Sequence, residues 1–194
     1  MRLPDFFILG APKCGTTSLY SYLRPHPSLF LCYPKEPNYY CTDVPVIRHL
    51  TERDAYQALF EAAPNGALLG DASASNLYSV AAVPRIIADN PVAKFIVCIR
   101  DPVDMFVSYH NQLLFDARES IADIEAAWRA SRNRFGNSDE IHPQNYAYVC
   151  GTGRQVVRLL QNADRGNVHF ILFNELRDDP RNVYASVLRF LDVK

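Results

Sequence analysis

The chain has 194 residues, of which 48% are hydrophobic and 21% are charged, and its formal net charge at pH 7 is −1. This length allows one sizeable core, so we expect a single domain over residues 1–194, and the near-neutral charge gives no global basic field that would attract nucleic acid or an anionic membrane. The sequence has no signal-peptide pattern and no apolar run of membrane-spanning length, and we therefore expect no membrane span and a cytoplasmic location.

The cysteines are five in number, and none of them has the CxxC spacing. An odd number without paired spacing predicts neither a disulfide framework nor a zinc site. We expect all five to be reduced, and we expect no metal. Cys14 lies next to a predicted helix start, where a thiol can become reactive, but a small residue that fills a loop is the favoured interpretation.

The segment from Asp5 to Leu23 has the pattern of a strand, a loop and a helix. The apolar run at Phe6 to Leu9 predicts a buried strand, the residues from Gly10 to Gly15 predict a tight turn, and helical spacing of apolar residues begins at Thr16. In such a unit the loop N–H groups and the positive end of the helix dipole converge on one point. The segment therefore predicts a phosphate site, and a purely structural turn is the alternative.

The lysine in this loop stands in an unusual place. Four residues separate Gly10 from Gly15, as in a P-loop, but a nucleoside-triphosphatase loop has its lysine directly after the second glycine. Thr16 occupies that position here, and the lysine lies inside the loop at Lys13. The resulting order, with Pro12 before the lysine and paired threonines after the second glycine, resembles the 5′-phosphosulfate loop of sulfotransferases that use 3′-phosphoadenosine-5′-phosphosulfate (PAPS).

Downstream of the predicted helix, the segment from Tyr33 to Tyr40 places a Lys-Glu pair among aromatic residues and prolines. A solvated turn is the simplest interpretation of such a pair, but its position just after the phosphate-site helix favours Glu36 as a general base. Lys-Glu followed by two aromatics also resembles the segment that carries the catalytic glutamate in glycan sulfotransferases. Those enzymes often have a histidine where this chain has Asn38.

The segments that follow predict a short helix over 54–63, a second strand over 67–71 and a helix over 84–89. The strand ends in an acidic residue, Asp71. Two interpretations stay open for this carboxylate: it caps the next turn, or it lines a ligand cleft, because α/β sheets bind ligands at the carboxyl ends of their strands.

The most apolar predicted strand spans 93–99 and ends at Arg100, after which an acidic turn with a proline opens a helix that contains Ser108. An arginine fork beside a hydroxyl suits a phosphate monoester. The spacing resembles the 3′-phosphate motif of PAPS-dependent sulfotransferases, Arg-x-Pro followed by a serine eight positions after the arginine. Many members have a second arginine at the position of Met105.

The last third of the sequence predicts an amphipathic helix over 121–134, a polar loop over 137–143, a helix that begins near 146 and is interrupted at 151–153, a strand over 167–173 and a helix over 180–191. Strands that alternate with helices in this way predict a parallel sheet covered on both faces. We therefore expect an α/β fold of three layers, α/β/α, with a central parallel sheet, similar to P-loop NTPases.

The resemblance to PAPS-dependent sulfotransferases covers nearly the whole chain and implies in-line transfer of a sulfuryl group from PAPS to a hydroxyl or amine of a carbohydrate or small-molecule acceptor. It implies that Glu36 deprotonates the acceptor, that Lys13 stabilises the leaving oxygen and that no metal is needed. The nucleotide-binding residues that it implies are Lys13, Cys14, Gly15, Thr16, Thr17, Ser18, Arg100 and Ser108.

Two other functions stay open. A P-loop kinase or NTPase needs an acidic residue for magnesium, for which Asp71 is the candidate, but it also needs the lysine that is missing after Gly15. A catalytically inactive module that retains the nucleotide site is the second alternative, and the methionine at position 105 supports it. Family members usually continue into a C-terminal segment that closes over the nucleotide, so we expect this chain to lack that segment.

Overall fold

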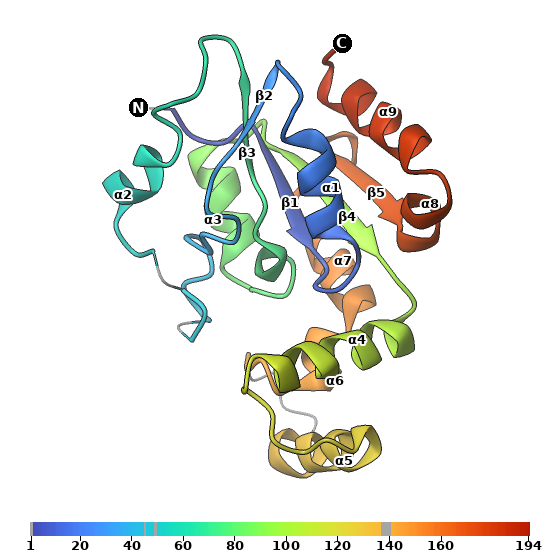
Figure 1. The fold of residues 1–194 in the computed structure, drawn as a ribbon. Coiled ribbons are helices and arrows are strands. Elements are labelled where there is room, and N and C mark those ends of the chain that lie inside the picture. Colours follow the sequence, from blue (N-terminus) through green and yellow to red (C-terminus); the bar gives the residue numbers. More distant parts are fainter. Residues whose placement is uncertain (1, 45, 49, 137–140) are drawn as a thin grey trace.

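The computed structural model describes residues 2–44, 46–48, 50–136 and 141–194, and their centre is a five-stranded sheet (Figure 1). Every strand pair is parallel, and the order across the sheet is β2-β3-β1-β4-β5. The strands are β1 (Phe6–Gly10), β2 (Leu29–Leu31), β3 (Leu68–Asp71), β4 (Lys94–Ile99) and β5 (Val168–Leu172). The predicted parallel sheet is confirmed.

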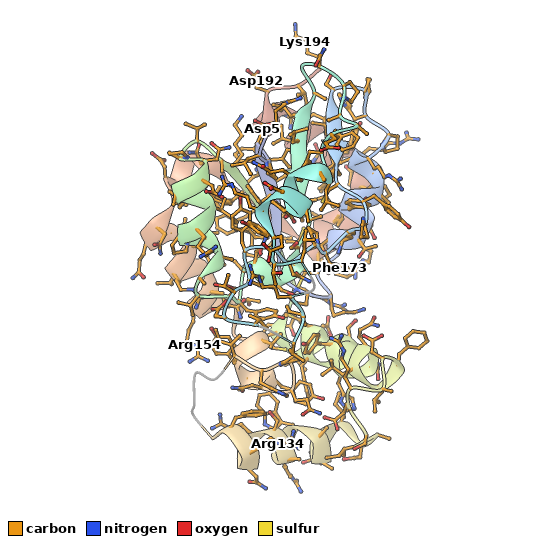
Figure 2. All side chains as sticks on the ribbon, turned by 90° about the vertical axis from the view of Figure 1, so that its left-hand side faces the viewer. Asp5, Arg134, Arg154, Phe173, Asp192 and Lys194 are labelled. Atoms are coloured by element: carbon orange, nitrogen blue, oxygen red, sulfur yellow. The ribbon has the colours of Figure 1, made fainter. Side chains whose placement is uncertain are left out.

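Helices cover both faces of this sheet. The helices α1 and α9 pack against each other on one face and α3 and α7 on the other, so that three layers are visible in Figures 1 and 2. The helices are α1 (Thr16–Leu23), α2 (Arg53–Ala58), α3 (Ala82–Asp89), α4 (Pro102–Phe115), α5 (Ile124–Phe135), α6 (Tyr146–Val149), α7 (Thr152–Asn162), α8 (Phe173–Asp178) and α9 (Pro180–Leu191). None of the described helices combines the length and the apolar character that a membrane crossing requires.

The two central strands explain why the sequence contains long apolar runs. All five residues of β1 and the four inner residues of β4 are buried, as expected for parallel strands with helices on both sides. On β3, Gly70 lies beside Phe6 of β1, and a Cβ atom at this glycine would lie 2.3 Å from the Phe6 ring. A side chain at position 70 would therefore displace a ring from the core.

The carboxyl ends of β1, β3 and β4 lie at the same edge of the sheet. Helices α4, α5 and α6 lie beyond this edge, and α5 is farthest from the strands (Figures 1 and 2). The N-terminus of α4 is capped by Asp101, whose carboxylate accepts hydrogen bonds from the amides of Val103 and Asp104. This cap sets the direction in which α4 leaves the sheet and passes the loop at the end of β1.

Several element boundaries differ from those expected. The predicted helix over 54–63 is the shorter α2, the helix after Arg100 continues to Phe115, and the strand β2 and the helix α8 were not predicted. The helix predicted from 146 is interrupted as expected, but the break lies at residues 150–151, because α6 ends at Val149 and α7 begins at Thr152 and includes Gly153. Residues 137–140 of the predicted polar loop lie outside the described residues.

Candidate functional site

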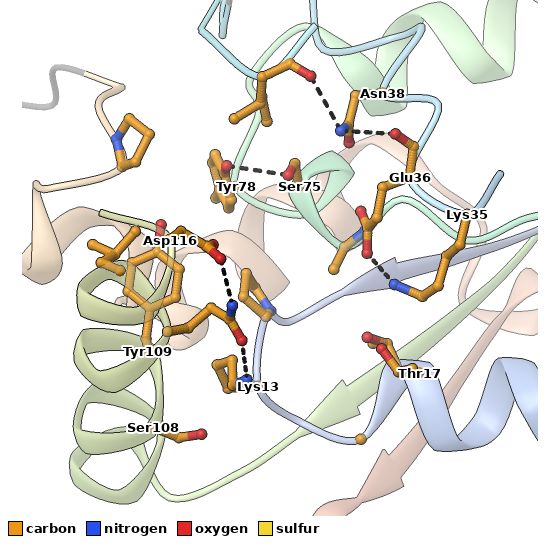
Figure 3. A pocket seen from close by; sticks show the side chains of 18 of the residues that line it. Lys13, Thr17, Lys35, Glu36, Asn38, Ser75, Tyr78, Ser108, Tyr109 and Asp116 are labelled. Atoms are coloured by element: carbon orange, nitrogen blue, oxygen red, sulfur yellow. Dashed lines mark hydrogen bonds and ion pairs between the residues drawn. The ribbon is translucent and has the colours of Figure 1, made fainter. Parts of the chain in front are cut away.

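A cavity of about 1050 Å³ opens at the carboxyl edge of the sheet (Figure 3). It is bounded by the loop between β1 and α1, the segment after β2, the turn after β3 and one face of α4. The lining residues that the sequence analysis singled out are Lys13, Gly15, Thr16, Thr17, Ser18, Glu36, Arg100 and Ser108. Residues from four separate parts of the chain therefore meet in one cavity.

The β1–α1 loop has the geometry of an anion site. The first backbone hydrogen bond of α1 is donated by Leu19 to the carbonyl of Gly15, at 3.0 Å, so the amides from Gly15 to Ser18 precede the helical ladder. Such amides, together with the helix dipole, bind anions. Gly15 has φ +90°, and a Cβ atom there would lie 2.6 Å from Leu176 of α8. Only glycine therefore fits this turn.

Lys13 also has a left-handed backbone, with φ 61°, and its ammonium group is held by α4. The Nζ atom donates to Oε1 of Gln112 at 3.0 Å, and Nε2 of Gln112 donates to Oδ1 of Asp116 at 2.9 Å (Figure 3). Gln112 and Asp116 were missed in the sequence analysis. Together with Ser108 they recur every four residues along α4 and its C-cap residue, Asp116, so the helical period was the signal that could have revealed this face.

Arg100 contacts several neighbours, among them the Asp104 carboxylate at 3.9 Å, yet one of its N–H groups has no acceptor among the described residues. Its guanidinium lies 4.4 Å from the centre of the Phe173 ring, and it donates to the carbonyl of Lys13 at 3.3 Å. Its Nε atom is buried and has no hydrogen-bond partner within the described part of the chain. A buried N–H without an acceptor is costly, and a phosphate oxygen would satisfy it. The residues present thus fit a nucleotide phosphate.

Met105, at the position where many sulfotransferases have a second arginine, is fully buried in the core. Its side chain is not among those that line the cavity. Ser108, one turn further along α4, does line it. The residues of the 3′-phosphate motif that line the cavity are therefore Arg100 and Ser108.

Glu36 faces the cavity from the opposite side (Figure 3). One carboxylate oxygen forms an ion pair with Lys35, and the other accepts a hydrogen bond from the amide of Ala74 at 2.8 Å. The backbone of Glu36 has φ 65°, and that of Asn38 has φ 51°. Two left-handed residues that are not glycine in so short a segment are unusual, and such strain is typical of functional sites.

Cys14 is the one predicted nucleotide-binding residue that does not line the cavity. Its side chain is buried, its Sγ donates to the carbonyl of Pro12 at 3.3 Å, and its amide donates to the carbonyl of Ala11 at 3.3 Å. Burial raises the pKa of this thiol to about 12. Its position therefore supports a loop-filling role rather than direct nucleotide contact or reactivity. All five cysteines are free and buried.

Asp71 has neither of the two roles expected for it. Its carboxylate is fully buried and accepts hydrogen bonds from the hydroxyls of Tyr56 and Ser73, both at 2.7 Å. It neither caps the turn that follows nor lines the cavity. Burial raises the pKa of the Asp71 carboxyl to about 6, and the two hydrogen bonds act in the opposite direction.

This position also removes Asp71 as a magnesium ligand at the cavity. Among residues 2–44, 46–48, 50–136 and 141–194, no group of three or more His, Cys, Asp or Glu side chains is arranged to hold a metal ion.

In the part of the cavity beyond Glu36 and Lys13, the sequence offered Tyr78 only as an aromatic that either stacks on a sugar or belongs to the core, and it did not point to Tyr109. The walls of this part combine apolar side chains with a few polar ones. Tyr78 donates its hydroxyl proton to Oγ of Ser75 at 3.1 Å, and Tyr109 lies across the space from them on α4 (Figure 3). An apolar cavity with few, well-placed polar groups is typical of a small-molecule or sugar site.

Comparison with known proteins identifies the family to which the chain belongs. The sulfotransferase domain profile matches residues 3–194. Carbohydrate sulfotransferase 15 of Mus musculus is 31% identical over an alignment that covers 62% of this chain and 29% of that protein. Heparan sulfate glucosamine 3-O-sulfotransferase 6 of Homo sapiens is 30% identical over 68% of this chain and 40% of that protein. The chain thus spans less than half the length of these relatives.

Solved structures agree with this match. A sulfotransferase from Alicyclobacillus acidocaldarius superposes with a TM-score of 0.90 at 31% identity and covers 100% of this chain and 83% of its own. The sulfotransferase domain from the curacin biosynthetic pathway, at 20% identity, has a TM-score of 0.65 and covers 100% of this chain and 76% of its own, which shows the shared fold. On the profile match over nearly its whole length, the chain belongs to the sulfotransferase domain family.

Proposed function

We propose that this chain catalyses transfer of a sulfuryl group from PAPS to a hydroxyl or amine of a carbohydrate or small-molecule acceptor. The observation that carries the proposal is the meeting of Lys13, Arg100 and Glu36 in one cavity, beside the amides that precede the first hydrogen bond of α1. The first two residues suit an anionic nucleotide, and the third suits a proton acceptor.

At the donor end, the loop amides together with Thr16, Thr17 and Ser18 hold the 5′-phosphosulfate in this proposal. Arg100 and Ser108 hold the 3′-phosphate, because the Nε atom of Arg100 is buried without an acceptor and Ser108 lines the same cavity. In this arrangement, fixed hydrogen-bond donors bind the negative charges of the nucleotide, and they need little reorganisation when it arrives.

In the transfer step, an acceptor oxygen or nitrogen forms a bond to sulfur while the bond between sulfur and the bridging phosphate oxygen breaks. The electron pair of that bond leaves with 3′,5′-adenosine bisphosphate (PAP). The acceptor proton passes to the Glu36 carboxylate, and the Lys13 ammonium stabilises the charge that develops on the leaving oxygen. The reaction therefore needs positioning and electrostatics from this chain's own side chains.

A carbohydrate acceptor has the support of two observations. The names of the curated relatives include a carbohydrate sulfotransferase and a glucosamine sulfotransferase. The wall beyond Glu36 includes parts of Tyr78 and Tyr109, whose side chains are largely buried, and the Ser75 side chain. Aromatic rings with polar tips suit the mixed apolar and polar faces of a sugar. The cytoplasmic location and the single domain over residues 1–194 stay predictions from the sequence.

Calorimetry without magnesium tests the donor site, with PAP compared against AMP and ATP. We expect PAP to bind at least tenfold more tightly than AMP, and a magnesium-dependent preference for ATP would instead support a kinase. Release of PAP from PAPS is then measured with heparan sulfate, which the name of one relative contains, with 4-nitrophenol and with water alone as acceptor. Tight PAP binding without release in any of the three would support an inactive binding module.

A further inference from the structure

A buried hydrogen-bond network connects Asp71 to the segment that carries Glu36. Oδ1 of Asp71 accepts from the Ser73 hydroxyl at 2.7 Å, and Oγ of Ser73 in turn accepts from the backbone amide of Asn38 at 3.1 Å. The side-chain amide of Asn38 then donates to the carbonyl of Glu36 at 3.0 Å. The network therefore runs from the end of β3 to the backbone on both sides of residue 37.

The turn after β3 holds this segment at two further points. The amide of Glu36 donates to the carbonyl of Ala72 at 3.2 Å, and the amide of Ala74 donates to the Glu36 carboxylate at 2.8 Å. The residues from 71 to 74 thus fix both the backbone and the side chain of Glu36. Without these bonds, the left-handed conformations of Glu36 and Asn38 would relax, because non-glycine residues rarely adopt them.

The charge on Asp71 sets the direction of the network. A carboxylate only accepts hydrogen bonds, so the Ser73 proton points to Asp71 and the Ser73 oxygen is left to accept from Asn38. No ion pair compensates this buried charge within the described residues. Burying a carboxylate without an ion-pair partner is costly to stability, even where hydrogen bonds satisfy its oxygens. A buried titratable group beside a candidate active site is a candidate for a functional role.

We propose that Asp71, acting through Ser73, is a positioning residue that holds the Glu36–Asn38 segment in its left-handed conformation and so directs the Glu36 carboxylate into the cavity. This inference rests on the proposed role of Glu36 as the base. Asp71 itself does not contact the cavity, so it acts only through the orientation of Glu36.

Asp71 is a buried titratable group of this network, and its surroundings determine how it responds to pH. The titratable groups that interact with it from the neighbouring elements are Tyr56, Cys32, Tyr40, Cys41, Lys35 and Glu36. Burial raises the pKa of each of the two cysteines and the two tyrosines among them, so these stay neutral near pH 7. Protonation of Asp71 replaces its charge-assisted bond from Ser73 with a weaker one.

Three variants test the proposal. Ser73→Ala removes the link to Asn38, Asp71→Asn removes the charge, and Tyr56→Phe is the matched control. Tyr56 donates to the same carboxylate over the same 2.7 Å, and within the described part of the chain its hydroxyl forms no hydrogen bond with residues 36–38. The readouts are PAP release from PAPS with water as the acceptor, PAP affinity by calorimetry, thermal unfolding, and amide hydrogen exchange of a peptide that covers residues 35–40.

We expect Ser73→Ala and Asp71→Asn to lower the rate of PAP release at least tenfold, while PAP affinity stays within twofold of wild type. Amide exchange at Asn38 accelerates at least tenfold in Ser73→Ala. Tyr56→Phe changes neither the rate of PAP release nor the rate of amide exchange by more than threefold. For Asp71→Asn we also expect the acid limb of the pH–rate profile near pH 6 to disappear.

Unchanged release and unchanged exchange in Ser73→Ala would overturn the proposal. A parallel fall of release, PAP affinity and melting temperature would also overturn it, because that pattern means a general structural role. If wild type binds PAP but releases none from PAPS, the proposed enzymatic function fails instead. The exchange rate at Asn38 then still decides whether Ser73 holds this segment.

Discussion

The ammonium of Lys13 lies 3.0 Å from the side-chain oxygen of Gln112, although 99 residues separate the two in the sequence. Gln112 is itself held by Asp116, one turn further along α4. The candidate catalytic lysine is thus placed by a helix that also carries Ser108. The proposed binding of PAPS by Ser108 and the proposed stabilisation of the leaving oxygen by Lys13 therefore depend on the same face of α4.

Replacing Gln112 with alanine is expected to lower kcat about fivefold, because one hydrogen bond that positions a group contributes about 1 kcal/mol. PAP affinity is expected to change little. Steady-state kinetics measure the effect, and the exposed neighbour Asn111→Ala is the control on the same helix. A rate equal to that of wild type would mean that Gln112 does not position Lys13 during turnover.

Arg100→Ala is expected to weaken PAP binding about 10- to 100-fold, because hydrogen bonds to charged groups contribute roughly 1.5–3 kcal/mol. AMP lacks the 3′-phosphate, so its affinity is expected to fall much less. Calorimetry with both nucleotides measures the difference, and Arg181→Ala removes an exposed arginine of α9 as a control. Equal losses for PAP and AMP would show that Arg100 does not contact the 3′-phosphate.

Glu36→Gln keeps the shape of the side chain but removes its ability to accept a proton. We expect kcat to fall by roughly 10²- to 10⁴-fold, the usual contribution of general acid–base catalysis, and PAP affinity to stay within twofold. The exposed Glu61→Gln is the matched control. Turnover that survives in Glu36→Gln would assign the proton transfer to another group.

Stability is expected to depend on pH through Asp71. Its pKa is about 6 in the folded chain and 3.8 in the unfolded reference, so between these values the folded state binds more protons. The free energy of unfolding therefore falls as pH rises from about 4 to about 6, by up to about 3 kcal/mol from this group. Asp71→Asn abolishes that contribution.

Urea unfolding at pH 4.5 and pH 7.5, in wild type and in Asp71→Asn, measures this effect. We expect the variant to gain stability relative to wild type as pH rises. A difference that is independent of pH would show that the Asp71 carboxyl does not titrate in this range.

The motifs that were predicted correctly are those whose residues act through local chain geometry. The loop from Gly10 to Gly15 lies between β1 and α1 as expected, and Arg100 follows β4 directly. A strand–loop–helix unit is determined by neighbours in sequence, so one segment of sequence was sufficient to predict it. The side-chain roles assigned to these residues stay predictions until they are measured.

The features that the sequence analysis missed depend on contacts between distant segments or on elements too short to show a pattern. The environment of Asp71 is made by Tyr56 from α2 and by burial under neighbouring elements. The strand β2 has only three residues, too few to show a period, and α8 begins at Phe173 directly after β5. No turn residue separates that strand from the helix, so the apolar run appeared to be one longer strand.

The packing of α8 against the first loop has a consequence for how the site forms during synthesis. Leu176 fills the space beside Gly15, and Phe173 lies under the guanidinium of Arg100. The phosphate loop is made within the first 18 residues, yet two of its supports, Phe173 and Leu176, come from α8. A nascent chain therefore cannot complete its nucleotide site until α8 has emerged from the ribosome and folded against the sheet.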